Sequence, residues 1–259
     1  MVNAPKYPVN TVIKAIELVE YLAGLNGGMG ATATEIWKAL DLTKSTTHRL
    51  LDTLSFFDWI TKDNDTGRYR LGWEMYKIGQ MLPTQNNLLS IDKKFLADLS
   101  NTVAATVNLG VLKHDETVII SQVESTHMKA ISHITAERYE AIYATALGKM
   151  MISEMSDDEI REMFSGTEFI KYTENTVNNV DELIERVNFA RKNGYALDEQ
   201  EFNENLYCIA MPIRNYTGRI VAALSVSSIP SEVTDEKREL ILTELKKTSD
   251  AISATLGNK

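Results

Sequence analysis

The chain has 259 residues, 44% hydrophobic and 24% charged, a composition typical of a soluble globular protein with room for one large domain or two ordinary ones. Its formal net charge of -9 excludes a protein that coats nucleic acid indiscriminately, and its single cysteine excludes an internal disulfide. Because it shows neither a long apolar run nor a signal-peptide pattern, we expect a cytoplasmic protein without a membrane partner.

The charge is unevenly divided along the chain. Residues 1–82 hold 9 Lys and Arg against 9 Asp and Glu, so the whole negative excess follows residue 82. This division predicts two modules with different partners, the first able to approach phosphate groups and the second not.

Two helices are predicted before residue 41. The stripe expected to be buried on the first, within residues 9–25, consists of Val12, Ile16, Val19 and Ala23, widened by Ile13 and Leu22. Thr32 and Glu35 have the spacing of a capping box, which predicts that a second helix begins at about Ala33.

A third predicted helix, capped by Thr43 and covering residues 44–54, has two faces. The stripe expected to be buried consists of Thr47, Leu50, Leu51 and Leu54. The exposed stripe consists of Ser45, His48, Arg49 and Asp52, with Lys44 at the helix start. Such a face can read base edges, although an ordinary solvated helix face has the same pattern.

A hairpin is predicted next, with strands at 56–62 and 68–71 joined by the turn-forming residues 63–67. Alternation along the second strand points Arg68 and Arg70 outward together. Three helices and a basic hairpin predict a winged helix-turn-helix. In that fold the third helix enters the major groove, and the wing arginines meet phosphates or the minor groove.

The remaining pattern predicts a linker helix over 73–82, interrupted at Pro83, and then a longer helix with an apolar stripe from Leu88 to Val103. The expected strands are 106–113, 117–123, 128–134, 195–198, 206–214 and 219–229. Helices are expected to begin near residues 146, 156 and 180 and after Thr234.

Small and polar residues mark one region of this second half. Ala146 and Gly148 lie at a helix start, which can bind an anion or simply allow tight packing. Ser225 and Ser227 share a strand face, and Leu206 and Cys208 alternate in the same way on the strand before it. We expect these groups to converge on one side of the sheet.

The first half resembles the IclR family of bacterial transcription regulators. The resemblance lies in Ala15-Ile16-x-x-Val19, Ala33-Thr34-Glu35-Ile36, Leu42-Thr43-Lys44-Ser45-Thr46-Thr47-His48-Arg49-Leu50-Leu51 and Tyr69-Arg70-Leu71-Gly72. It implies that the run from Lys44 to Arg49 is the recognition helix. The expected DNA contacts are Lys44, Ser45, Thr46, His48 and Arg49, with Arg68 and Arg70 from the wing.

The second half is similar to the effector domain of the same family, which is GAF-like. The matching words are Thr145-Ala146-Leu147-Gly148-Lys149, Asn193-Gly194-Tyr195-Ala196-x-Asp198-x-x-Glu201, Cys208-Ile209-Ala210-x-Pro212-Ile213 and residues 218–227. The effector contacts that this resemblance implies are Ala146, Leu147, Asp198, Leu206, Cys208, Ser225 and Ser227. The chain departs from the family pattern at Glu137, Ala141 and Asn205, and Glu137 in the pocket would disfavour an anion.

We therefore expect an α+β protein in three parts. These are a winged helix-turn-helix DNA-binding domain (8–72), a linker helix and hinge (73–87), and a GAF-like antiparallel sheet domain with flanking helices for effector binding and oligomerisation (88–259). The predicted function is a repressor whose binding to double-stranded operator DNA responds to a small organic acid or related catabolite. The resemblance implies a homodimer, and a dimer of dimers.

Two other functions compete with this one. A GAF-type enzyme could use Cys208, but there is no second cysteine and no histidine in the neighbouring segments, so a buried structural or pocket-lining cysteine is favoured. One cysteine and four scattered histidines also show no zinc-ligand spacing, and we expect no metal or cofactor. Alternatively, the second half only oligomerises and binds no ligand.

Two roles are open for Asp198. Its carboxylate could accept hydrogen bonds from the hydroxyl groups of a ligand, or it could cap a turn.

Overall fold

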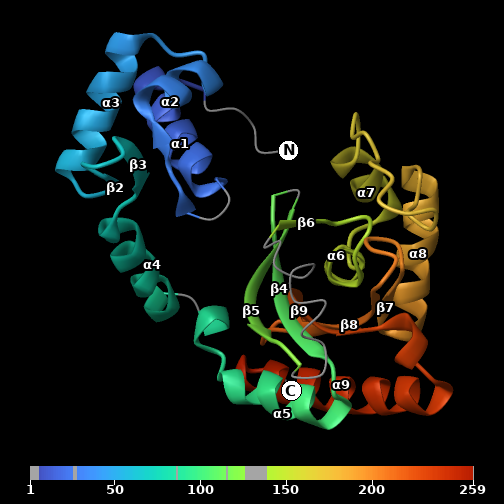
Figure 1. The fold of residues 1–259 in the computed structure, drawn as a ribbon. Helices are drawn as coiled ribbons and strands as arrows, with labels where there is room; N and C mark the ends of the chain where they lie inside the picture. Colours follow the sequence, from blue (N-terminus) through green and yellow to red (C-terminus); the bar gives the residue numbers. More distant parts are fainter. Residues whose placement is uncertain (1–5, 26–27, 86, 115, 126–138, 259) are drawn as a thin grey trace. The chain divides into compact units, whose positions relative to one another are not determined.

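The computed structural model describes the chain except residues 1–5, 26–27, 86, 115, 126–138 and 259 (Figure 1). It divides into two compact units, residues 2–86 and residues 87–259. Among the described residues, no helix is both long enough and apolar enough to cross a membrane.

The first helix, α1 (Asn10–Ala23), buries a different face from the one expected. Leu18 and Leu22 are its buried residues, and only Leu22 was in the predicted set. Val12 and Ile16 instead remain 53% and 52% exposed. The prediction was wrong because both faces of this helix carry apolar residues, and periodicity alone does not say which face meets the core.

The next two helices begin at the predicted caps. In α2 (Ala33–Ala39), Thr32 and Glu35 form the reciprocal capping box. In α3 (Lys44–Phe56), the Thr43 side chain accepts a hydrogen bond from the Thr46 amide. The buried side of α3 is the predicted one, with Thr47, Leu50 and Leu51 buried and Leu54 partly buried.

The hairpin forms with a shorter first strand than expected. The strands are β2 (Ile60–Lys62) and β3 (Arg68–Leu71), because α3 continues through Phe56, which we expected to be extended. A third strand, β1 (Ala31–Thr32), pairs with β3, and the sheet order is β1-β3-β2. Two residues are too few to give a periodic signal in the sequence.

The linker helix α4 (Trp73–Gln85) passes through Pro83, where we expected it to stop. A proline within a helix removes one amide hydrogen bond, and here the helix ends within one further turn. The long helix expected next is two elements. A short 3₁₀ turn, η2 (Asn87–Ser90), precedes α5 (Lys93–Val103), whose start is capped by the Asp92 side chain.

The second unit is built on an antiparallel sheet with the order β6-β5-β4-β9-β8-β7 among the described residues. Its strands are β4 (Thr106–Lys113), β5 (Glu116–Val123), β6 (Tyr139–Ala141), β7 (Ala196–Glu199), β8 (Tyr207–Arg214) and β9 (Ile220–Ser228). The strand expected at 128–134 and the departure at Glu137 lie outside the described residues.

Helices cover both faces of this sheet (Figure 1). On one face, α5 packs with α9 (Asp235–Thr255), which follows the 3₁₀ turn η3 (Pro230–Glu232). On the other face lies α6 (Ala146–Met151). Beyond it are α7 (Asp157–Met163) and α8 (Val180–Asn193), closed by Gly194 as expected. The apolar core of this unit fills the space between the sheet and these helices.

Candidate functional site

The exposed face of α3 carries most of the expected DNA contacts. Lys44, Ser45, His48 and Arg49 are all exposed. The Lys44 ammonium group lies 4.5 Å from the centroid of the Trp37 ring on α2, a cation–π contact at the start of the helix. The position of Lys44 is therefore tied to both helices of the helix-turn-helix.

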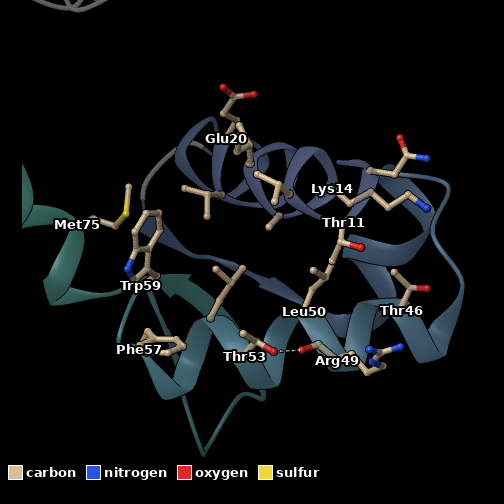
Figure 2. A pocket seen from close by; sticks show the side chains of 16 residues that line it. Thr11, Lys14, Glu20, Thr46, Arg49, Leu50, Thr53, Phe57, Trp59 and Met75 are labelled. Atoms are coloured by element: carbon tan, nitrogen blue, oxygen red, sulfur yellow. Dashed lines mark hydrogen bonds between the residues drawn. The ribbon is translucent and has the colours of Figure 1, made fainter. Parts of the chain in front are cut away.

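Thr46 and Arg49 line a groove of about 1000 Å³ between α1 and α3, which is the second feature of this unit. In Figure 2, α1 lies along one side and α3 along the other. Lys14, Thr46 and Arg49 are at one end of the groove, and the apolar side chains of Phe57, Trp59 and Met75 are at the opposite end (Figure 2). Val12, Ile16 and Val19 of α1 also line it.

The two wing arginines, which we expected to point outward together, are each bound to acceptors within their own unit. Arg68 donates to the Gly30 carbonyl at 2.8 Å and to Glu35 at 2.9 Å. Arg70 donates to Asp63 at 2.6 Å. Both pairs are partly exposed, so each contributes little to stability.

The seven residues expected to contact an effector line one cavity in the second unit. It is lined by Asn108, Thr145, Ala146, Leu147, Asp198, Phe202, Leu206, Cys208, Ser225 and Ser227. These side chains come from four strands, the start of α6 and the turn between β7 and β8. The volume is about 20 Å³, which is room for roughly one water molecule.

The sheet side of this cavity is a patch of polar residues set by strand register. Asp198 on β7 pairs with Cys208 on β8, and Cys208 pairs with Ser227 on β9. Ser225, two residues along β9 and so on the same face, pairs with Asn108 on β4. The register thus brings four distant parts of the sequence together.

Asn108 was not among the expected contacts, but it holds the polar patch in place. Its side-chain amide donates to the Ser227 hydroxyl at 3.2 Å and accepts from Gln122 at 2.7 Å. The Cys208 thiol donates to the same hydroxyl at 3.3 Å. A hydroxyl oxygen that accepts two hydrogen bonds directs its own hydrogen elsewhere, so Ser227 is arranged as a donor. A lone asparagine among the apolar residues of β4 is the sequence signal for this role.

Asp198 serves as a turn-capping carboxylate and also lines the cavity. It is 1% exposed, and its Oδ1 atom accepts from the backbone amides of Glu201 at 2.7 Å and Phe202 at 3.3 Å. Burial raises the pKa of Asp198 to about 7, although the nearby Lys149 charge and these amides oppose that shift. The carboxyl therefore titrates near neutral pH.

A buried ion pair lies beside Asp198 and was also missed. Lys149 on α6 donates to Glu201 at 2.5 Å, and the two side chains are 1% and 2% exposed. The backbone carbonyl of Glu201 accepts from the Thr176 hydroxyl at 2.6 Å. The signal in the sequence is a single lysine inside the apolar segment that forms α6.

Gly148, the small residue directly before this lysine, lies where the backbone packs too closely for a side chain. A Cβ atom at this position would lie 2.3 Å from the Ile142 carbonyl oxygen, so the α6 backbone packs directly on that segment. Tight packing therefore accounts for Gly148, whereas Ala146 lines the cavity.

Cys208 is buried, with 8% of its surface exposed, and it also lines the cavity. Both favoured interpretations, a buried cysteine and a pocket-lining cysteine, therefore apply to this residue. Among the described residues that line the cavity, there is no histidine that could act as a base for it. Within the described part of the chain, no group of three His, Cys, Asp or Glu side chains could hold a metal ion.

Comparison with known proteins identifies the family of both units. Residues 11–64 match the IclR helix-turn-helix domain, and residues 81–254 match the domain described as "Bacterial transcriptional regulator IclR C-terminal".

Individual relatives agree with these matches. The transcriptional regulator XynR of Escherichia coli is 31% identical over 224 residues, covering 86% of this chain and 88% of XynR. The transcriptional repressor IclR of E. coli is 28% identical over 231 residues, covering 88% of this chain and 83% of the repressor. An IclR homologue from Microbacterium hydrocarbonoxydans, crystallised with 4-hydroxybenzoate, has the same fold, with a TM-score of 0.80, 20% identity and coverage of 95% and 98%. The chain belongs to the IclR family of bacterial transcriptional regulators and combines a DNA-binding helix-turn-helix with the family's C-terminal effector-binding domain.

Proposed function

We propose that this protein is a repressor whose binding to operator DNA is modulated by a small organic acid in the Asp198–Ser227 cavity. The observation that carries the proposal is that all seven residues transferred from the family pattern line this one cavity. Its hydroxyl donors, its α6 start and its few apolar walls suit a small ligand with an acidic group. The E. coli relative named as a repressor supports the sign of regulation.

Effector binding requires the cavity to open. A volume of about 20 Å³ is far below the roughly 300 to 1000 Å³ of ordinary ligand pockets. A ligand must therefore separate the sheet from α6 or from the turn that carries Phe202. Because the ligand binds the opened form better, it shifts the protein toward that form.

The experiment is a thermal-shift screen of organic acids on the full chain, followed by operator binding with any compound that stabilises it. A ligand raises the melting temperature according to its concentration relative to its Kd. The matched control is Ser227→Ala, which removes a cavity hydroxyl and should weaken the shift. A C-terminal domain that only oligomerises would respond to no compound.

For the DNA interface, we propose base-reading contacts from Lys44, Ser45, His48 and Arg49, with Thr46 beside them. Arg68 and Arg70 would hold phosphates after exchanging their carboxylate partners. The charge balance of residues 1–82 supports this assignment, because the acidic second half would be repelled by DNA.

We infer that the chain works as a homodimer formed through the N-terminal unit, and that effector domains pair two dimers. The groove of about 1000 Å³, which is lined in part by the half-exposed Ile16, supports the dimer. A second copy of the chain would cover the apolar end of this groove. One winged module makes few base contacts, and paired half-sites supply the missing specificity.

We further propose the functional boundaries 8–72 for DNA binding, 73–87 for the linker and 88–259 for effector binding and oligomerisation. Catalysis is not part of the proposed function. Cys208→Ser should leave the ligand response intact, because serine preserves a donor toward Ser227.

A further inference from the structure

The effector cavity poses an electrostatic problem for the acidic ligand proposed above. Among the described residues that line it there is no lysine, arginine or histidine, and Asp198 carries their one carboxyl group. Lys149, whose charge acts on Asp198, is already bound to Glu201 in the buried ion pair. A ligand carboxylate would therefore meet a like charge, and no cation in the described part of the cavity wall compensates it.

The groups that face Asp198 do not remove this repulsion. From α6 comes Lys149, and from the turn comes Glu201, so this buried pair has no net charge. From β8 comes the Cys208 thiol, whose hydrogen is donated to Ser227. The two backbone amides bind Oδ1 of Asp198, and among the described residues no hydrogen bond to its Oδ2 occurs.

We propose that the cavity takes up a monocarboxylate effector together with one proton from solvent, which Asp198 holds and donates to the carboxylate of the effector. The two carboxyl groups then share one O–H···O hydrogen bond and carry a single negative charge between them. Two carboxyl groups that share one proton in a buried site are a known solution to like-charge repulsion. The proposal rests on the proposed effector function of this same cavity.

The protonation state of free Asp198 agrees with this arrangement. Burial raises the pKa of this carboxyl to about 7, so only a small free-energy cost attends its protonation at neutral pH. Above neutrality each effector molecule must bring one proton with it. Linkage then makes the affinity for a monocarboxylate fall about tenfold for each pH unit.

The test begins with matched pairs of probes on the full chain: 4-hydroxybenzoate and the straight-chain acids from acetate to hexanoate, each with its primary amide. Any acid that stabilises the chain is then titrated by calorimetry at pH 8.0 in phosphate and in Tris, whose ionisation enthalpies differ. The proposal expects uptake of about one proton per site. It also expects affinity about tenfold weaker at pH 8.5 than at pH 7.5.

The deciding variant is Asp198→Asn. Its Oδ1 can still accept both backbone amides, and its NH₂ group donates to a carboxylate at every pH. We expect affinity that does not change from pH 7.5 to 8.5, whereas the matched surface control Asp158→Asn keeps the pH dependence of the unmodified chain. Should Asp198→Asn not fold, proton uptake by the unmodified protein still decides the question.

Four outcomes overturn the proposal. Binding of an acid without proton uptake, or equal binding of acid and amide, would show that Asp198 does not supply the proton while leaving the effector function standing. If only amides stabilise the chain, the effector is not a carboxylate. If no acid or amide stabilises it, the proposed effector function fails, and this proposal with it.

Discussion

Lys149 and Glu201 are bound side chain to side chain at 2.5 Å, almost completely buried, between α6 and the turn that follows β7. This ion pair joins the helix that supplies Ala146 and Leu147 to the turn that supplies Phe202. Any opening of the effector cavity between these two walls therefore strains or breaks it.

Breaking the ion pair should destabilise the second unit selectively. We expect Lys149→Met to cost about 3 to 5 kcal/mol, because Glu201 is left charged and buried, and adding Glu201→Leu to restore most of that loss. The three tryptophans, Trp37, Trp59 and Trp73, all lie in residues 2–86, so tryptophan fluorescence reports the unfolding of the first unit. In urea, the midpoint of the fluorescence transition should not change, whereas the circular dichroism transition of the second unit should move to a lower urea concentration. Equal shifts of both transitions would contradict this.

The stability of the second unit should depend on pH through Asp198. Its folded pKa of about 7 is above the ordinary value of 3.8, so the folded state holds this proton more tightly than the unfolded state does. Stability is therefore lost as pH rises from about 4 to 7, by about 1.4 kcal/mol per unit, and stays low above that window. Asp198→Asn should remove this loss. The check is to measure the difference in unfolding free energy between the unmodified protein and Asp198→Asn at pH 5 and at pH 8. The same difference at both pH values would contradict this prediction.

Arg49→Ala should weaken operator binding by about 1 to 3 kcal/mol if the guanidinium group reads a guanine edge. Gel-shift titration on operator and on random DNA measures this. An equal loss on both would mean that Arg49 only holds phosphate. Because Arg49 also lines the groove beside α1, light scattering on the variant must show an unchanged oligomer.

The wing arginines should control the salt dependence of DNA binding. Arg70→Ala should lower the slope of log K against log salt by about 0.9, since one phosphate contact is lost. Asp63→Asn keeps the acceptor for the Asp65 and Thr66 amides but releases Arg70, and should strengthen binding. Arg68→Ala tests the second arginine in the same way. Unchanged slopes in both alanine variants would remove the wing from the interface.

Ile16→Asp should weaken the dimer at least tenfold, because a charge would be buried in the apolar part of the groove. Met29→Asp is the matched control, since Met29 is 72% exposed and lies outside the groove. Light scattering across a dilution series distinguishes the two. A monomeric unmodified protein at micromolar concentration would contradict the dimer itself.

Local chemistry in the sequence was enough for much of the fold. The caps at Thr32, Thr43 and Thr234 begin helices as predicted, because a side-chain oxygen and a backbone amide a few residues apart meet without help from the rest of the chain. The alternation of Ser225 and Ser227 likewise required only the two-residue period of a strand.

Tertiary structure decided what depends on partners distant in the sequence. The outward face of α1, the pairing of Arg68 with Glu35 and the Lys149–Glu201 ion pair each join surfaces that periodicity cannot match to one another. The effector cavity has the same origin: the sequence and its family resemblance supplied the seven residues, but only strand register placed Asn108 and Asp198 around one space. Local pattern determines which way a side chain points along its own element, whereas its neighbour across the core is chosen by the packing of the whole unit.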